Sequence, residues 1–515
     1  MSVKTAGELA PLKGGALAVT ALALALGTFM QVLDVTIANV SLPTIAGNLG
    51  ASTDQSTWII TSFVVANGIS MPLTGWLMHR YGVVKVFLLA ILGFTIASFL
   101  CGIAWNLESL VFFRALQGAV SGPVIPGSQA LMLSIFPHSR RATALGIWSI
   151  TTLVAPICGP MLGGYISDSW HWGWIFLINV PVGLTVVFLC WNGLQGRETV
   201  TRKLPIDGVG LALLVIWAGA LQVMLDTGKD ADWFASTQIV ILAIISAVGF
   251  VAFLLWELTE EHPIVDLSLF RSRNFAIGTM VFCLGNGVFL SNMLLMPLWL
   301  QTHLGYTATW AGLVTAPTGV VAVLLTPAAA KAMGRMDARW IASIAFLASA
   351  ASYFLRAGLT ADASFWAIAT PLMVQGIANA TFFIAVVSLL MDDVPPSQIP
   401  SASGLSNFAR IIAAGFSVSI VTTLWDRREA LHQSRLADFT SEYAPVFNQA
   451  LSAMQGLGLS DLAGKAALTK GMVSQAYLLA SIDIFYLSAW LSLLAVALTW
   501  LCHRVRVAAR PPVAD

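Results

Sequence analysis

Long runs of apolar residues, separated by short polar stretches, recur along almost the whole chain. A helix crosses the hydrocarbon core of a bilayer in about 20 residues, and fourteen of these runs have a suitable length. The pattern therefore predicts an all-α, polytopic membrane protein with fourteen transmembrane helices. The predicted spans lie near residues 16–39, 56–78, 83–103, 108–134, 142–165, 173–194, 206–226, 236–256, 274–302, 309–330, 339–358, 364–391, 403–425 and 479–502.

The composition supports lipid as the main solvent of this chain. Only 10% of the residues are charged, whereas 57% are hydrophobic and the mean hydropathy is +0.81. Soluble proteins carry roughly a quarter charged residues, so a surface exposed to water cannot be built from this set. The net charge of +1 argues against a nucleic-acid partner.

Neither a metal site nor an enzyme active site is expected. The five cysteines all fall in apolar stretches without a metal-ligand spacing, which indicates buried thiols. The chain has no P-loop, HExxH or GxSxG motif, and its membrane-embedded polar residues form no nucleophile–base set. The first apolar run, residues 15–33, is too long for a cleavable signal peptide and no small-residue cleavage site follows it.

The basic residues predict the orientation, because cytoplasmic loops are enriched in lysine and arginine. If the N-terminus is cytoplasmic, seventeen basic residues lie on the cytoplasmic side and the short outer loops hold only Lys229 and Arg356. Both termini are therefore predicted to be cytoplasmic. The polar segment 427–478 would then lie outside the membrane, either as a solvated loop or as short amphipathic helices with a gating or partner-binding role.

A weak internal repeat predicts how the spans are grouped. The segments 75–85 and 331–339 are both short, basic, glycine-bearing and predicted to be cytoplasmic. If they correspond, residues 1–200 form one six-helix half, residues 201–260 two inserted helices, and residues 261–515 a second six-helix half. Such halves are a transporter architecture in which the substrate binds at their interface near the bilayer midplane.

Two charged residues are predicted at equal depth in the membrane. Asp34 in the first span and Arg114 in the fourth both lie roughly 9 Å below the outer surface, judged from the helical rise. An ionisable side chain in the hydrocarbon costs about 2.5–3.5 kcal/mol on insertion scales, so its presence favours a functional role. Asp34 is the candidate proton carrier and Arg114 its regulator, because a carboxylate responds to burial and to a nearby arginine. A static pair that fixes helix register is the structural alternative.

Arg410 is a third charge within a predicted span, roughly 12 Å from the inner surface. It could bind an anionic group of a substrate or act on a proton site; alternatively it bonds to carbonyls and to amides such as Gln375 or Asn379. Asn286 and Asn292 in the ninth span could line a polar stripe facing the cavity, although such residues commonly form interhelical bonds. These five residues are the candidate substrate cavity.

Several motifs resemble the major facilitator superfamily, and within it the fourteen-helix drug:proton antiporters of the EmrB/QacA group. The first-span sequence Leu-Asp34-Val-Thr-Ile-Ala-Asn resembles that group's membrane-aspartate motif. Arg114-Ala-Leu-Gln117-Gly118 resembles its R-x-x-Q-G motif, whose arginine is linked to proton transfer. Gly159-Pro160-Met-Leu-Gly163-Gly164 in the fifth span resembles the antiporter motif G-P-x-x-G-G, which is associated with export. Apart from the resemblance, these residues would suit a hinge, a seal or close helix packing.

The segment 75–85 resembles the signature loop of the superfamily, with Gly75, Arg80, Gly82 and Lys85 at the motif positions. It departs from that loop where His79 stands at the usual aspartate, so the charge relay of the aspartate does not carry over directly. The remaining motif residues are expected to take part in the conformational change.

The resemblance implies a proton-coupled antiporter that exports lipophilic small molecules from a bacterial inner membrane. It further implies an EmrA-type periplasmic adaptor and a TolC-type outer-membrane channel, with protons as the coupling ion and no other cofactor. Three alternatives remain open at this stage. They are a transporter, exporting or importing, of a single natural metabolite such as a fatty acid; a membrane enzyme; and a sensor that does not transport.

Overall fold

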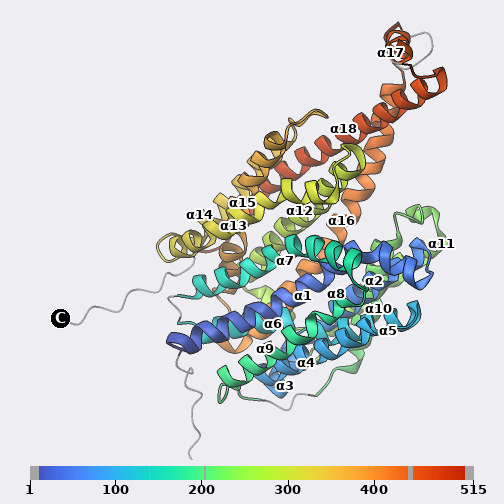
Figure 1. Ribbon diagram of the computed structural model, residues 1–515. Helices are drawn as coiled ribbons and strands as arrows, with labels where there is room; N and C mark the ends of the chain where they lie inside the picture. Colours follow the sequence, from blue (N-terminus) through green and yellow to red (C-terminus); the bar gives the residue numbers. More distant parts are fainter. Residues whose placement is uncertain (1–10, 138–139, 202–204, 439–444, 457, 505–515) are drawn as a thin grey trace, which may run out of the picture.

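The computed structural model describes residues 11–137, 140–201, 205–438, 445–456 and 458–504, and the described residues form helices and no strand (Figure 1). The first part of the chain contains α1 (Gly14–Leu49), α2 (Thr53–Ser70), α3 (Thr74–Tyr81), α4 (Val83–Gly102), α5 (Leu107–Ser121), α6 (Val124–Ile135), α7 (Arg141–Ser169), α8 (Trp174–Leu177) and α9 (Asn179–Gly193). The middle part contains α10 (Gly208–Thr227), the short η2 (Trp233–Ala235) and α11 (Thr237–Thr259).

The last part of the chain follows the same helical plan. It contains η3 (Leu267–Arg271), α12 (Arg273–His303), α13 (Ala308–Met333), α14 (Ala338–Arg356), α15 (Phe365–Met391), η4 (Pro396–Gln398), α16 (Ile399–Ala437), α17 (Pro445–Gly456) and α18 (Asp461–Thr499).

Polar capping residues fix where several of the apolar helices begin. Ser52 and Gln55 form a capping box at the start of α2, and Asn106 and Ser109 do the same for α5. The side chain of Ser364 accepts a hydrogen bond from the first turn of α15. Such caps satisfy backbone N–H groups that a helix leaves unpaired at its N-terminus, so short polar turns suffice to separate long apolar helices.

Eleven helical segments of the described chain are long and apolar enough to cross a membrane. A twelfth is α2 with α3, two helices that meet at a 55° bend. The two remaining predicted spans fall on α5 with α6 and on α7, which are helical but lie outside that set. The all-α membrane architecture is thus confirmed, while the count of fourteen spans stays a prediction.

The helices pack in two groups, as the ribbon shows (Figure 1). In the N-terminal group α1 packs on α7 and α9, and α5 packs on α2 and α4. In the C-terminal group α12 and α14 pack on α15 and α18, and α12 also packs on α16. The paired helices α10 and α11 attach through α10 to both α2 and α16. The predicted division into two six-helix halves and two inserted helices, with boundaries at residues 200 and 260, stays a prediction. From here, N-half means α1–α9 and C-half means α12–α18.

The two halves contact each other toward the end of the molecule where α1 begins, which is on the left in Figure 1. There His79 Nε2 lies 2.9 Å from the carbonyl oxygen of Ser397. Nearby, Asn407 donates a hydrogen bond of 3.0 Å to Gln129 Oε1. Toward the opposite end the two groups of helices diverge (Figure 1). The structure is therefore closed at the end that the sequence predicts to be cytoplasmic.

The segment 427–478 is more helical than the sequence indicates. α16 and α18 extend well beyond the predicted spans, and α17 lies between them as a short separate helix at the upper right of Figure 1. Leu451 of α17 is buried against Gly464 of α18. Of the predicted amphipathic pieces, α17 is a separate helix, while residues 439–444 and 457 lie outside the described chain.

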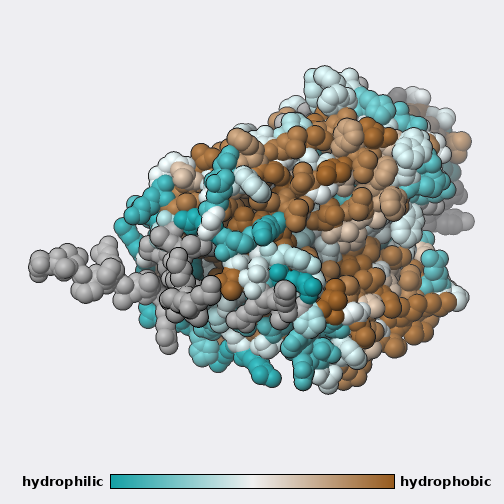
Figure 2. Space-filling view, turned by 90° about the horizontal axis from the view of Figure 1, so that it is seen from below, coloured by the Kyte–Doolittle hydropathy of each residue, from teal (hydrophilic) through white to brown (hydrophobic). Residues whose placement is uncertain are grey.

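The molecular surface matches a lipid environment. In Figure 2 hydrophobic residues cover much of the visible face, whereas hydrophilic residues are frequent along its left and lower edges. Large apolar side chains such as Leu89, Val248 and Leu324 are more than half exposed. A soluble protein rarely exposes so much contiguous apolar surface, and a bilayer would cover it.

Candidate functional site

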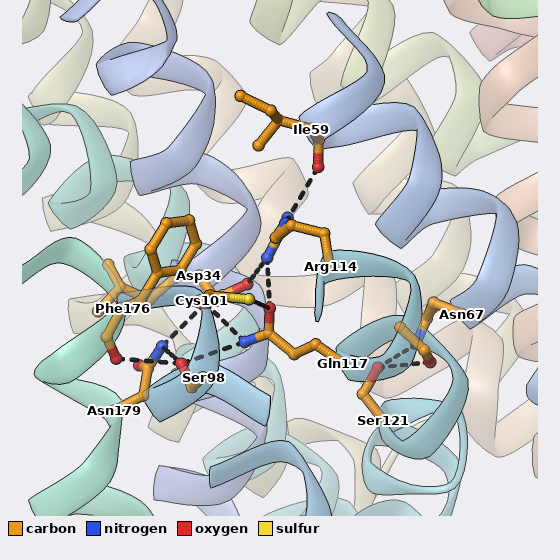
Figure 3. Close-up of polar contacts among 12 residues, drawn as sticks. Asp34, Ile59, Asn67, Ser98, Cys101, Arg114, Gln117, Ser121, Phe176 and Asn179 are labelled. Atoms are coloured by element: carbon orange, nitrogen blue, oxygen red, sulfur yellow. Dashed lines mark hydrogen bonds and ion pairs between the residues drawn. The ribbon is translucent and has the colours of Figure 1, made fainter. Parts of the chain in front are cut away.

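A buried ion pair lies at the centre of the N-half. Arg114 Nη1 of α5 lies 2.5 Å from Asp34 Oδ2 of α1, and both side chains are 0% exposed (Figure 3). The two charges that the sequence placed at equal depth are therefore in direct contact. Because neither faces lipid nor reaches the outer surface, each charge depends on its protein partners for stabilisation.

The second carboxylate oxygen of Asp34 is held by amides. Gln117 Nε2 donates to Asp34 Oδ1 over 3.1 Å, and Asn179 Nδ2 donates to the same oxygen over 2.8 Å. Both amides also donate to Ser98 Oγ, which in turn donates to the carbonyl of Phe176 (Figure 3). Helices α1, α4, α5 and the α8–α9 segment thus meet at one carboxylate.

Arg114 is held just as firmly on its other side. Its Nε donates to the carbonyl of Ile59 in α2 over 3.0 Å, and its Nη1 also donates to Gln117 Oε1 over 2.7 Å. The guanidinium carbon lies 4.3 Å from the ring centroid of Phe63 and 5.4 Å from that of Phe176. Stacking on aromatic faces stabilises a desolvated guanidinium, whereas Nη2 is buried without a hydrogen-bond partner.

The arrangement gives the Asp34 carboxylate a complete set of partners. An arginine and two amide donors surround its two oxygens, and all of them stabilise negative charge. Separating Arg114 from Asp34 would leave a buried carboxylate without its counter-charge, which is costly.

Sequence reasoning missed two members of this network. Asn179 is an amide within the apolar run of residues 173–194. A polar side chain in such a run predicts a hydrogen bond inside the helix bundle, so the sequence could have indicated this residue. Ser98 gave no such signal, because a serine in a membrane helix ordinarily bonds to its own backbone. Cys101 was expected only as a buried thiol, and it is buried with its Sγ 3.6 Å from Gln117 Oε1.

The glycines of the fourth- and fifth-span motifs bring helices together around this pair. A methyl group on Gly118 would collide with the backbone of Phe63 in α2. In α7, a methyl group on Gly159 would collide with Thr36 of α1, and one on Gly163 would be tightly placed against Ile37 of α1. Gly164 is not part of this packing, because nothing lies within 4 Å of its missing side chain. The side chain of Pro160 lies outside the described part of the chain. The glycines therefore set the approach of α7 to the helix that carries Asp34.

The signature loop between α3 and α4 contributes to the closed end. Gly75 packs against Ser401 of α16 so closely that a side chain would not fit. His79 bonds to Ser397, as described above, where the superfamily has an aspartate. Arg80 lies over the ring of Trp76 with its guanidinium carbon 5.3 Å from the centroid.

A glutamate caps α4 in the same loop and was also missed from the sequence. Glu198, beyond α9, accepts the backbone N–H groups of Val84 and Lys85 over 3.0 and 2.9 Å. Gly82 has φ +97° and leaves the space that this carboxylate fills. The Lys85 side chain is exposed. A carboxylate at a helix N-terminus is electrostatically favourable, which explains why this position needs a glycine.

The five candidate substrate residues of the C-half do not form one cluster but take part in three separate sets of contacts. Arg410 donates to Asn407 Oδ1 and Asn286 Oδ1, both over 3.2 Å, and lies over Phe282 at 5.5 Å. Gln375 and Asn379 instead bond to each other over 3.4 Å and line a small cavity among α12, α14, α15 and α18. The fifth candidate residue bonds to α18: Asn292 donates to Ser488 Oγ over 2.8 Å. The predicted amide partners of Arg410 are thus replaced by Asn407 and Asn286.

Arg356 does not lie in an outer loop, as the sequence predicted. It is the last residue of α14, is 2% exposed, and stacks on Tyr353 at 5.0 Å. The apolar pattern ends too gradually there for the span boundary to be placed within a turn. Among the described residues, no three His, Cys, Asp or Glu side chains are grouped to hold a metal ion.

Comparison with known families identifies the framework in which this site lies. The model of the Major Facilitator Superfamily matches residues 24–418. The multidrug export protein EmrB of Escherichia coli K12 is 46% identical over 495 residues, which cover 95% of this chain and 96% of that protein. The fatty acid resistance protein FarB of Neisseria gonorrhoeae is 45% identical, with 98% of each chain covered.

Solved structures share the fold at low sequence identity. The proton:xylose symporter XylE matches with a TM-score of 0.60 and 14% identity, over 94% of this chain and 95% of that structure. The human organic anion transporter MFSD10 matches with a TM-score of 0.59 and 14% identity, over 93% of this chain and all of that structure. At this identity the two matches bear on the fold alone.

Proposed function

The chain belongs to the major facilitator superfamily and is a secondary transporter rather than an enzyme, and we propose that it exports hydrophobic toxic compounds in exchange for protons. The observation that carries the proposal is the fully buried Asp34–Arg114 pair within a network of amide donors. A transporter needs a group whose charge depends on conformation, and this pair supplies one without any chemical step.

Proton coupling follows from competition for Asp34. A proton that reaches Asp34 from the outside neutralises the carboxylate and removes the attraction that holds Arg114 to it. The contact between α1 and α5 then loosens, which favours the alternative arrangement of the halves. Release of the proton on the other side restores the ion pair. Each charge that crosses 100 mV of membrane potential supplies about 2.3 kcal/mol to this cycle.

Arg410 is the best-placed residue of the C-half for contact with a substrate. It is partly exposed, and among the described residues its hydrogen bonds go to neutral amides rather than to a carboxylate. A guanidinium whose described hydrogen bonds go to neutral amides can still attract an anion, and the ring of Phe282 provides an apolar neighbour. This favours hydrophobic weak acids among the exported compounds.

A second candidate function is transport of a single natural metabolite, specifically a fatty acid. The favourable observations are Arg410, which suits a carboxylate head group, and the relative named for fatty acid resistance. Both functions use the same coupling pair and differ only in the breadth of substrates.

The similarity to EmrB also supports a proposal for the membrane in which this protein resides and for its partner proteins. The multidrug export protein EmrB named above is a protein of Escherichia coli, and the distribution of basic residues in this chain predicts that both termini are cytoplasmic. We therefore assign the chain to a bacterial inner membrane. An EmrA-type periplasmic adaptor and a TolC-type outer-membrane channel complete the proposed pump, with the projection around α17 as a surface on the outer side.

Transport by the purified protein in liposomes with an imposed pH gradient tests the proposal. We expect several acidic hydrophobic compounds to be moved against the proton flow, with loss of transport when a protonophore collapses the gradient. A panel that includes cationic dyes and fatty acids separates broad export from transport of one metabolite. Transport that ignores the gradient, or that follows the protons inward, would contradict the proposal.

A further inference from the structure

Two buried carboxylates meet where the inserted helices α10 and α11 reach the closed end of the molecule. Asp207 precedes α10 and accepts the backbone N–H of Gly210 over 2.8 Å. The indole Nε1 of Trp256 lies 3.0 and 3.1 Å from its two carboxylate oxygens. None of these contacts involves the network around Asp34.

The second carboxylate belongs to Glu257, in the last turn of α11. Its side chain is buried in a residue only 4% exposed, and its Oε2 accepts the backbone N–H of Val265 over 3.1 Å. Its Oε1 is buried without a hydrogen-bond partner. A side chain on Gly210 would collide with this Oε1 and with Oδ2 of Asp207, so the two oxygens face the same small space.

Within the described residues, no basic side chain is among the charged groups that act on Glu257: these groups are Asp207 and Glu260, both acidic. Two carboxylates that face one buried space repel each other when both are ionised, and one shared proton would remove that repulsion. A proton on Oε1 would also turn the orphaned acceptor into a donor toward Asp207, which satisfies both groups.

We propose that Asp207 and Glu257 form a second proton-binding site of this transporter, which holds one shared proton while the end near the termini is closed. The site is separate from Asp34, which lies in the N-half, and it faces the opposite side of the membrane in the predicted topology. Its ligand is a proton rather than a metal ion, because two carboxylates are too few to enclose a cation.

The contacts around the site connect it to the helices of the closed end. Val265, bonded to Glu257, is followed by Asp266, whose carboxylate is 3.5 Å from Gln398 Nε2 at the start of α16. On the other side, the residues before Asp207 include Pro205, whose carbonyl accepts Trp76 Nε1 of α3 over 2.9 Å.

The segments on both sides of the site are thus attached to the two helices that close this end, α3 and α16. Loss of the shared proton creates repulsion between the two carboxylates and loosens these attachments. We therefore expect an alkaline pH on the side of the termini to favour opening of that side.

A carboxyl titration in the intact, membrane-embedded protein tests the site independently of transport. Infrared difference spectra between about pH 5 and about pH 9 should show one buried protonated carboxyl that disappears in Glu257→Gln and persists in Asp34→Asn. The matched control is Glu261→Gln, an exposed glutamate nearby, which should leave the band unchanged. An unchanged band in Glu257→Gln overturns the proposal, and so does a titration that shifts with sodium or magnesium concentration.

The effect on the transport cycle gives a second readout. Glutamine at position 257 can donate permanently to Asp207, as the protonated acid would, so the closed arrangement should no longer respond to pH on that side. We expect wild-type efflux to change several-fold with the pH on the side of the termini and the variant to be nearly independent of it. If Glu257→Gln fails to fold, Asp207→Asn should give the same two results. Retained dependence on that pH contradicts the proposal, whereas loss of all coupling in Asp34→Asn concerns the proposed function alone.

Discussion

The polar interiors of the two halves differ in how completely their charges are paired. In the N-half, Asp34 and Arg114 neutralise each other, and amides occupy the remaining bonds of the carboxylate. In the C-half, Arg410 has only amide partners, and buried atoms of Asn286 and Asn292 remain without partners. Unpaired buried atoms occur in both halves, since Arg114 Nη2 also lacks a partner. The difference between the halves is the counter-charge: among the described residues, Arg114 contacts a carboxylate and Arg410 does not. This difference motivates the proposed division of roles, in which the N-half pair binds the proton and Arg410 of the C-half contacts the substrate.

Removal of the charge of Asp34 should have the largest effect on this comparison. Asp34→Asn keeps the shape of the side chain but can no longer alternate between charged and neutral states. We expect efflux driven by a pH gradient to fall to the background of empty liposomes, while the protein still folds and inserts. Fluorescent-substrate efflux from proteoliposomes, together with thermal unfolding in detergent, measures both properties.

Asp362→Asn is the matched control for that experiment, because Asp362 is an exposed carboxylate between α14 and α15. It should transport like the wild type. Undiminished gradient-driven export by Asp34→Asn would remove the N-half pair from the coupling mechanism and leave the two halves without the division of roles argued here.

Truncation of Arg114 should mainly reduce stability. Arg114→Ala leaves a buried carboxylate without its counter-charge, which typically costs about 3–5 kcal/mol. The double variant Asp34→Asn/Arg114→Ala should recover part of this loss, because no unpaired charge remains. Thermal unfolding of the four proteins in a double-mutant cycle measures the coupling between the two residues. Additive losses would show that the pair does not act as one unit.

Replacement of Arg410 should change substrate preference rather than coupling. A hydrogen bond to a charged group contributes about 1.5–3 kcal/mol, so Arg410→Ala should weaken transport of hydrophobic acids by roughly tenfold or more. Cationic dyes should be exported as before, and the dependence on the pH gradient should remain. Arg335→Ala, which removes an exposed arginine after α13, is the control. An equal loss for acids and cations would argue against an anion site in the C-half.

The two halves also differ in how far the sequence could predict them. Asp34 and Arg114 were predictable because a charge in an apolar run is costly, and helical rise alone placed both at one depth. Asn179 and Ser98 were not singled out, since their contact with Asp34 depends on how α4 and α9 rotate about their axes. That rotation is set by packing between helices, so it cannot be predicted from the sequence of a single apolar run.

The predicted amide partners of Arg410 were wrong for a related reason. Gln375 and Asn379 lie in the predicted span, but they face α14 instead of Arg410. Similarly, the helical extensions of α16 and α18 could not be separated from a loop, because their composition is polar and the helices are stabilised by each other. The order of the spans was a property of the sequence, whereas the face that each presents was a property of the assembled bundle.

The smallest expected effect gives the sharpest test, because the two halves offer a matched pair of asparagines. Asn179 and Asn292 are both buried, and each donates to a serine hydroxyl, over 2.9 and 2.8 Å. Replacing either by alanine should cost about 1–3 kcal/mol of stability, the usual penalty for leaving a buried polar partner unsatisfied. Only Asn179 also donates to Asp34, so only Asn179→Ala should change how efflux depends on the outside pH, by a few-fold at most. Efflux measured at several outside pH values, with thermal unfolding as the reference for equal destabilisation, separates the two variants. The same response in both would mean that general loosening of the bundle, rather than the environment of one carboxylate, governs coupling.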